Sequence, residues 1–400
     1  FCSRAFWHQS MMETTAPTEQ ENCQLEGAKM NSSQTLLNLA NAIMGSGVLA
    51  VPYAFGITSY WAVCLLFLVS GLTILPAFLI GDALKLARQK GLDSGQPADS
   101  RDFTYLAEVC FGPRGKGIVA IITFTEVWVS CVTRLVLSGN NLHAVLALSQ
   151  TQAVLVSTFM CLVMIFIPLR LYAYISLAGL VAMMVATVCF LMDLFTIHLS
   201  EWSVPALQST PNFENLFEAY GLFMFCFSGL PCLPSFHEGM QKAQRWTCCV
   251  SWTFAMASVF YLAVGLLSYL IRGRNVVPVF TADMTVPLLR DFAVGLFAVK
   301  IQAGTPLMMR VVLLSLQIWP SGESVKDISF KKSLPATLVI FLTGLAACFL
   351  ANDIAVLASF TGAVIMNLTC LMIPCLMYMK LSLRFLGWKG QPPKTKAKLV

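Results

Sequence analysis

Three charged side chains, Glu126, Arg134 and Lys300, lie within stretches that are otherwise almost entirely apolar. Glu126 and Arg134 share the stretch TEVWVSCVTRLVLSGNNLH, two helical turns apart and on roughly one face. A charge inside an apolar span is costly, and it usually faces the bundle interior, where it pairs with another charge or serves ion movement. A Glu126–Arg134 or Glu126–Lys300 pair is one interpretation, with either a structural or a coupling role. Arg134 contacting a substrate carboxylate or another anion is the alternative.

The main chain offers a second kind of chemistry. Gly45, Ser46 and Gly47 interrupt the apolar stretch NLANAIMGSGVLAVPYAF of residues 38–55, and glycine costs a helix about 1 kcal/mol relative to alanine. A second interruption, FSGLPCLP, occupies residues 227–234. Broken helix is tolerated in hydrocarbon only where protein covers it or where it lines a watery cavity. Close helix packing by small residues is the simpler explanation of one break, but two matched breaks favour a binding site.

Free N–H groups at the start of a half-helix favour a carboxylate, with help from the helix dipole. Freed carbonyls in the second break would take an ammonium group, and a ligand that carries both groups is an amino acid. The substrate-binding residues predicted from the two breaks are Gly45, Ser46, Gly47, Phe227, Ser228 and Gly229.

Composition indicates the elements that must hold these groups. Of the 400 residues, 57% are hydrophobic and 12% are charged, against about 25% charged in soluble proteins, and the mean hydropathy is +0.73. The long continuous apolar runs predict an all-α polytopic membrane protein. We expect ten spans, at roughly 34–55, 58–81, 118–148, 152–169, 171–195, 214–237, 247–271, 287–319, 334–351 and 354–379.

Polar segments flank and connect the spans. Residues 1–33 are predicted to be a disordered cytosolic tail, residues 34–380 the transmembrane domain, and residues 381–400 a basic cytosolic tail. Residues 102–112 look like a short interfacial helix. The net charge of +6 gathers in loops that the positive-inside rule assigns to the cytosol, together with the N-terminus, which explains it without nucleic-acid binding.

Other chemistry is sparse. His237, at the cytosolic end of the sixth span, is either a gating or proton-carrying residue, since histidine titrates near neutral pH, or an ordinary interface residue. No spacing of cysteine and histidine resembles a metal site, and no phosphate loop or catalytic cluster occurs. The sequence therefore predicts neither an enzyme nor a bound metal or cofactor.

The breaks fall in the first and sixth spans, which are five spans apart. Five spans per half place the second half in the membrane upside down, as in inverted-repeat transporters with discontinuous helices at the midplane. Alternating access to one central site is the mechanism that this arrangement predicts.

Several of these stretches carry a resemblance to a known family. The stretch NLANAIMGSGVLAVPYAF resembles the first span of the amino acid/auxin permease family, especially its neutral amino acid transporters. FMFCFSGLPCLPSFHEGM, TEVWVSCVTRLVLSGN, AVKIQAGTPLM and LASFTGAVIMNLTCLMIPCLMYMKL resemble the vesicular inhibitory amino acid transporter branch. The resemblance implies a fold similar to the bacterial leucine transporter, with five-plus-five inverted repeats. The family usually has an eleventh span; here a Pro/Lys tail follows the tenth, so we expect a truncated record or a short member.

The resemblance also implies roles for individual residues. Glu126 and Lys300 match charged residues of the vesicular branch, and Asn41 matches an asparagine associated with sodium in the neutral amino acid carriers. Thr305 falls one place away from the threonine that accompanies it there, which favours protons over sodium. Arg134 stands where the vesicular branch looks to have an aromatic residue, so the substrate need not be that of the branch.

We therefore expect a secondary active transporter of small, neutral amino acids, coupled to protons, in a vesicle, lysosome-type or plasma membrane. Glu126, Arg134, Lys300, Thr305 and His237 are the candidates for coupling or gating. A non-transporting amino acid sensor on the same scaffold and a sodium-coupled symporter are the alternatives. An ion channel is less consistent with the sequence, because no ring of pore-lining charge is visible.

Overall fold

The computed structural model describes residues 30–92, 101–146, 148–164, 169–196, 211–274, 276–321, 334–350 and 354–390. Residues 1–29 and 391–400, which hold most of the two expected tails, lie outside this described part, as do the lysines between residues 322 and 333. The described chain is helical, with one isolated bridge between Met30 and Met240.

Each of the ten expected spans coincides with a helix or with a set of consecutive helical segments. These are α2 (Ser32–Ile43) with η1 (Ser46–Ala50) and α3 (Val51–Thr58); α4 (Trp61–Gln89); α5 (Phe103–Leu146); α6 (Gln150–Met164); α7 (Leu169–Thr196); α8 (Phe213–Cys226) with η4 (Leu230–Cys232) and α9 (Leu233–Glu238); α10 (Trp246–Arg272); α11 (Pro287–Ser321); α12 (Leu334–Phe349); and α13 (Ile354–Phe360) with η8 (Thr361–Met366), η9 (Leu368–Met372) and α14 (Ile373–Gly390). By length and composition, six helical segments of the described residues can cross a membrane, or seven with the bent pair formed by residues 32–43 and 46–58.

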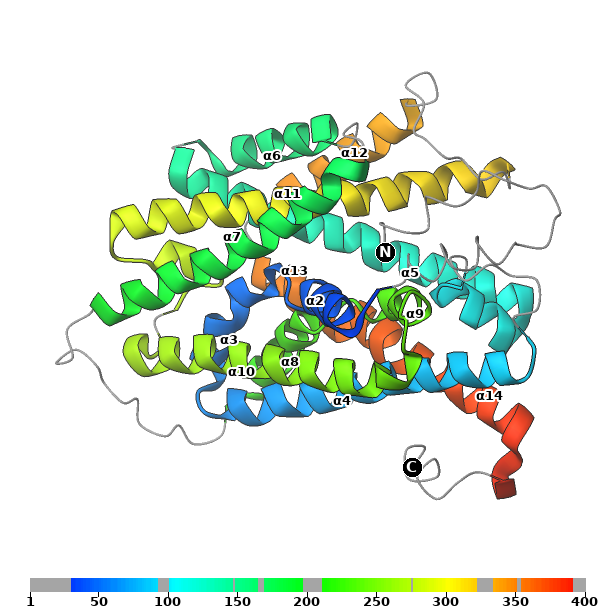
Figure 1. Cartoon of the computed structure of the whole chain (residues 1–400). Coiled ribbons are helices and arrows are strands. Elements are labelled where there is room, and N and C mark those ends of the chain that lie inside the picture. Colours follow the sequence, from blue (N-terminus) through cyan, green and yellow to red (C-terminus); the bar gives the residue numbers. More distant parts are fainter. Residues whose placement is uncertain are drawn as a thin grey trace.

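Two groups of helices enclose the centre of the molecule. Helix α11 packs on α7 and α5, and α6 packs on α5 and α12, whereas α10 packs on α2, α3 and α4. Figure 1 shows α6, α7, α11 and α12 along the top and α4, α8 and α10 along the bottom, with α2 and α9 between them. The α2 and α9 parts of the two interrupted spans thus lie between these groups, covered by protein as broken helix in a membrane must be.

Three boundaries differ from those expected. Helix α4 continues to Gln89 instead of ending near residue 81. Its last turns are charged but helical, and they contain an ion pair between Lys85 and Asp82, one turn apart at 3.8 Å. The last helix runs to Gly390, so residue 381, the expected start of the C-terminal tail, lies inside it, with Leu381 buried. At the other end, α2 already begins at Ser32, where Asn31 and Gln34 form a reciprocal capping box.

The expected short helix at residues 102–112 is present as the first part of α5. It ends at Gly112, whose φ of 77° and ψ of −173° interrupt the helical geometry before Pro113. This left-handed φ favours glycine, which has no Cβ to clash. Phe103, Leu106 and Ala107 are fully buried, so this segment packs on the protein along one face.

A close approach of two backbones joins the sixth span to the tenth. A Cβ added at Gly362 of η8 would lie 1.8 Å from the carbonyl oxygen of Gly221 in α8, and one added at Gly221 would lie 2.0 Å from the carbonyl oxygen of Ser359. Small residues allow such contact between membrane helices. The hydrogen bonding in η8 and η9 is of the π type, which is frequent at functional sites.

Candidate functional site

The first span breaks where the sequence predicted. Helix α2 ends at Ile43, Gly45 is extended (φ −101°, ψ −161°), and the chain resumes as η1 at Ser46. The two halves are bent by 45°. Ser46 and Gly47 begin η1, and their N–H groups are therefore those that a helix start leaves without a preceding carbonyl in the same helix.

The sixth span breaks in the same way. Helix α8 ends at Cys226, and Gly229 has a φ of 107°, which only glycine adopts readily, before η4 begins at Leu230. The Phe227 ring is fully buried and stacks on Phe254, with centroids 5.7 Å apart. Phe227 therefore offers the break its carbonyl and not its side chain.

The two breaks lie against each other. A Cβ at Gly229 would be 3.1 Å from the Ala42 carbonyl oxygen, and a Cβ at Gly47 would be 3.0 Å from the Cys226 Cα. The buried Tyr261 hydroxyl, from α10, lies 3.1 Å from the carbonyl oxygens of both Ile43 and Cys226. One side chain thus joins the last residues of the two half-helices. Since a hydroxyl has a single proton, the two carbonyls share it.

Tyr261 could not be found from a sequence motif, because a tyrosine in an apolar span is usually a packing residue. We expect Tyr261→Phe to lower the melting temperature in detergent. It leaves two buried carbonyls without this donor, at a cost of roughly 1–3 kcal/mol for a buried group left unsatisfied. Tyr220→Phe is the matched control, since the half-buried Tyr220 hydroxyl has no hydrogen-bond partner among the described residues. Equal behaviour of the two variants would contradict this role for Tyr261.

Partial exposure marks a space at the crossing. Asn41, Gly45, Ser228 and Gly229 are only half-buried, although Ile43, Ser46, Phe227 and Leu230 beside them are buried. A small pocket opens next to it, lined by Ser46, Gly47, Ala50, Leu137, Phe225, Pro278, Ala355 and Ala358. The two breaks are therefore brought together, and Ser46 and Gly47 of the first break border the small pocket beside them.

The charged candidates divide between two places. Lys300 is 8% exposed, and its Nζ donates a hydrogen bond of 3.0 Å to Oδ1 of Asn41. Arg134 lies across α11, with its Nη1 3.2 Å from the position of a Cβ on Gly304. Glu126 instead lies beside Thr369 and Cys370 of the tenth span.

An internal Glu126–Arg134 or Glu126–Lys300 ion pair, one expectation from the sequence, is not found among the described residues. The expectation of a shared face failed because eight residues at about 100° each leave the two side chains of α5 about 80° apart. Thr305 is buried and bonds to the carbonyl of Ile301 in its own helix, so its hydroxyl is used within α11.

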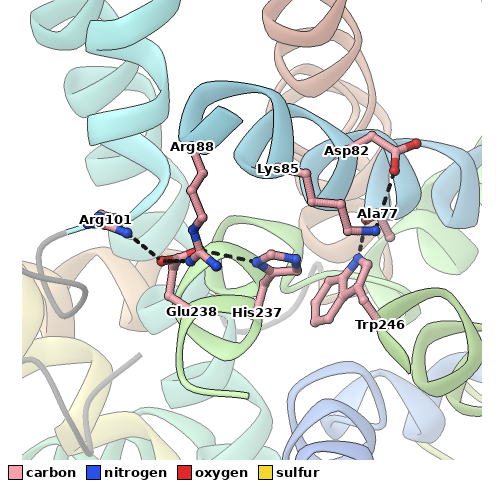
Figure 2. A network of polar contacts seen from close by, with 8 residues as sticks. All are labelled: Ala77, Asp82, Lys85, Arg88, Arg101, His237, Glu238 and Trp246. Carbon is pink, nitrogen blue, oxygen red and sulfur yellow. Dashed lines mark hydrogen bonds and ion pairs between the residues drawn. The ribbon is translucent and has the colours of Figure 1, made fainter. Parts of the chain in front are cut away.

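One end of the molecule carries a network around Glu238. This carboxylate accepts hydrogen bonds from Nη2 of Arg88, at 2.8 and 3.0 Å, and from Nη1 of Arg101, at 3.1 Å. Figure 2 shows both arginines directed at Glu238, with His237 beside it and Trp246 on the far side of His237. His237 is buried, 3.3 Å from Glu238 through Nδ1 and edge-on to Trp246. The network connects α9 to α4 and to the start of α5.

The opposite end has a counterpart that sequence reasoning missed. Asp193, fully buried at the end of α7, pairs with Arg272 of α10 at 2.8 Å. It also accepts from the backbone N–H groups of Thr285 and Val286, which precede Pro287 at the start of α11, as a cap does. Asp193 thus gives the basic residue Arg272 a buried carboxylate partner at this end of the molecule.

Nearby, burial raises the pKa of the Asp283 carboxyl above its ordinary value. The hydrogen bond that it accepts from the N–H of Val277 and the positive charge of Arg272 reduce this rise but do not cancel it. No group of three or more histidine, cysteine or acidic side chains that could hold a metal ion occurs in the described residues.

Known proteins share the sequence pattern and the fold of this chain. The profile of the family described as "Transmembrane amino acid transporter protein" matches residues 28–398. The chain belongs to this family. Its members are transporters, and neither an enzymatic role nor a soluble one is consistent with the match.

Among individual relatives, "Amino acid transporter AVT1C" of Arabidopsis thaliana is 25% identical over 370 residues, which cover 86% of this chain and 62% of the relative. The "Vesicular inhibitory amino acid transporter" of Xenopus tropicalis is 24% identical over 373 residues, with 88% and 70% covered. The chain thus spans less than two thirds of the length of the first of these relatives.

Two solved structures share the fold. The structure of MhsT in complex with L-phenylalanine has a TM-score of 0.53 at 12% identity, covering 91% of each chain. The structure of a mutant manganese transporter of Eremococcus coleocola has a TM-score of 0.52 at 15% identity, covering 96% of this chain and 85% of that one. The fold similar to the bacterial leucine transporter, with broken first and sixth spans, is confirmed.

Proposed function

We propose that this protein is a secondary active transporter that moves small neutral amino acids across a membrane by alternating access. The observation that carries the proposal is the meeting of two helix breaks, with the ends of their first halves joined by the Tyr261 hydroxyl. The N–H groups of Ser46 and Gly47 would bind the substrate carboxylate, and the carbonyls of Phe227 and Ser228 its ammonium group. The names of the relatives support amino acids as the substrate class.

The charge networks at the two ends fit this mechanism. Arg101 precedes α5 and Glu238 ends α9, so their contact joins the first group of helices to the interrupted sixth span. The first, second, sixth and seventh spans would rock against the rest, opening the Glu238 end and the Asp193 end in turn. We assign the Glu238 end to the cytosol, because the basic loops lie at that end. We place the protein in a vesicle membrane by analogy with the vesicular relative.

Protons are the proposed coupling ion. The Asn41 side chain, which the family resemblance associates with sodium, has its Oδ1 bonded to the Lys300 ammonium group. A fixed cation therefore occupies an oxygen that a sodium ion would need as a ligand. Glu126, buried beside the tenth span with Oε2 unbonded in the described part of the chain, is the group that would take and release the proton.

Uptake into proteoliposomes under imposed gradients tests the function. We expect an inward proton gradient to drive accumulation of a small neutral amino acid, and an equal sodium gradient to have no effect. Glu126→Gln should reduce proton-driven accumulation to background while counterflow of labelled amino acid persists, because exchange needs no net proton movement. Accumulation driven equally by sodium would contradict proton coupling. Binding without any counterflow would favour the sensor alternative.

A further inference from the structure

Two positive side chains, one from α11 and one from α5, lie along the same stretch of α11 in the interior of the molecule. Lys300 projects from α11, and Arg134 of α5 lies over Gly304, which follows Lys300 by one helical turn. The two cations are close enough to interact electrostatically. The absence of a side chain at Gly304 gives the Arg134 guanidinium its room.

Neither cation has an acidic partner among the described residues. Lys300 bonds to the neutral Asn41 amide, and the buried Nε of Arg134 has no hydrogen-bond partner. Glu126 faces the tenth span, and the paired carboxylates Glu238 and Asp193 lie at the two ends of the molecule. An uncompensated buried charge is unfavourable, so an added negative charge would stabilise this pair.

The position of the pair indicates where that charge enters. Asn41 belongs to the last turn of α2, just before the first break. Arg134 lies over Gly304, one helical turn along α11 from Lys300. Lys300 therefore borders the space in which the proposed function places the substrate, and Arg134 lies one helical turn from it.

A zwitterionic amino acid cannot neutralise this site, because its ammonium group cancels its carboxylate. We propose that Arg134 and Lys300 form an anion subsite that takes one negatively charged group in addition to the substrate α-carboxylate. The group is a carboxylate, supplied by the side chain of a dicarboxylic amino acid, or a small inorganic anion that enters with a neutral one. The inference rests on the proposed function, and in the dicarboxylic case it replaces the neutral amino acid proposed there with an acidic one.

Uptake by the full chain in proteoliposomes separates these sources. Glutamate is compared with glutamine, each in chloride and in gluconate. If the substrate supplies the charge, glutamate uptake exceeds glutamine uptake in either salt. If a free anion supplies it, glutamine uptake falls when gluconate replaces chloride. The expected ratio is about tenfold or more, since hydrogen bonds to charged groups contribute a tenfold to hundredfold change in affinity.

The wild type should show either a glutamate-to-glutamine uptake ratio or a chloride-to-gluconate uptake ratio well above one. Arg134→Gln should bring that ratio to about one, and Arg134→Lys, which keeps the charge, should retain most of it. Without ligand, Arg134→Gln should melt at the same temperature or higher, because it removes an unpaired buried charge. Lys242→Gln, at an exposed lysine, is the control for net charge and should change nothing.

A wild type that moves glutamine equally well in both salts, with no preference for glutamate, would overturn the subsite and leave the proposed function intact. A ratio unchanged in Arg134→Gln would also overturn the subsite. Absence of any uptake or binding by the wild type would overturn both.

Discussion

Gly45→Leu is expected to abolish uptake, by more than about 100-fold or about 2.7 kcal/mol, in a protein that still folds. A Cβ at Gly45 would meet no atom within 4 Å, and the extended backbone there suits any residue. A leucine side chain therefore fits at position 45 without strain. It fills the space between the two breaks, which is the space that the substrate needs. Uptake and melting temperature, measured on the same preparation, check this result.

Gly71→Leu is the matched control, because Gly71 lies on the exposed face of α4 and its Cβ also meets open space. It should leave uptake within about twofold of the wild type, as surface substitutions usually do. Gly47→Leu should differ from both, since its Cβ would press on the backbone of Cys226 and damage folding as well as uptake. Normal uptake by Gly45→Leu would argue strongly against a substrate site at the breaks.

Gly362→Ala is expected to prevent folding or to lower the melting temperature sharply. Its new methyl carbon would lie 1.8 Å from the carbonyl oxygen of Gly221 and 2.7 Å from the carbonyl carbon. Overpacking a core typically costs about 1–3 kcal/mol, and here the obstacle is backbone, which cannot rotate away as a side chain can. Size-exclusion chromatography and thermal melts in detergent measure the effect.

The control for this substitution is Gly295→Ala, at an exposed position of α11 with open space around the new Cβ. Because alanine is the better helix former by about 1 kcal/mol, this variant should be as stable as the wild type or slightly more so. Gly362→Ala protein that elutes as a single species and melts with the wild type would show that the two backbones do not touch as described.

Sequence patterns predicted the spans and both breaks because these are local properties. An apolar run of about 20 residues crosses a bilayer whatever surrounds it, and glycine or proline within it interrupts the helix whatever it faces. The same reasoning located the residues at the breaks themselves, such as Gly45 and Ser228. It failed on the boundary of α4, where charged residues that stay helical were interpreted as a loop.

Partners that come from distant parts of the chain could not be predicted in this way. Tyr261 bonds to carbonyls 218 and 35 residues away, and the residues of the Asp193–Arg272 pair are 79 positions apart. Nothing in the local pattern around either residue indicates which side chain or carbonyl it will meet. The angle between Glu126 and Arg134 is a different case, because about 80° follows from helix periodicity alone and was available from the sequence.

The contact between Gly221 and Gly362 has a consequence for how the molecule moves. Where two main chains touch without intervening side chains, neither helix can approach further, and sliding would bring a bulky neighbour such as Phe225 or Met366 into the gap. Rotation about the touching point remains free of such collisions. The crossing is thus a fulcrum: displacement of the sixth span against the tenth is smallest there and grows along the helices on either side.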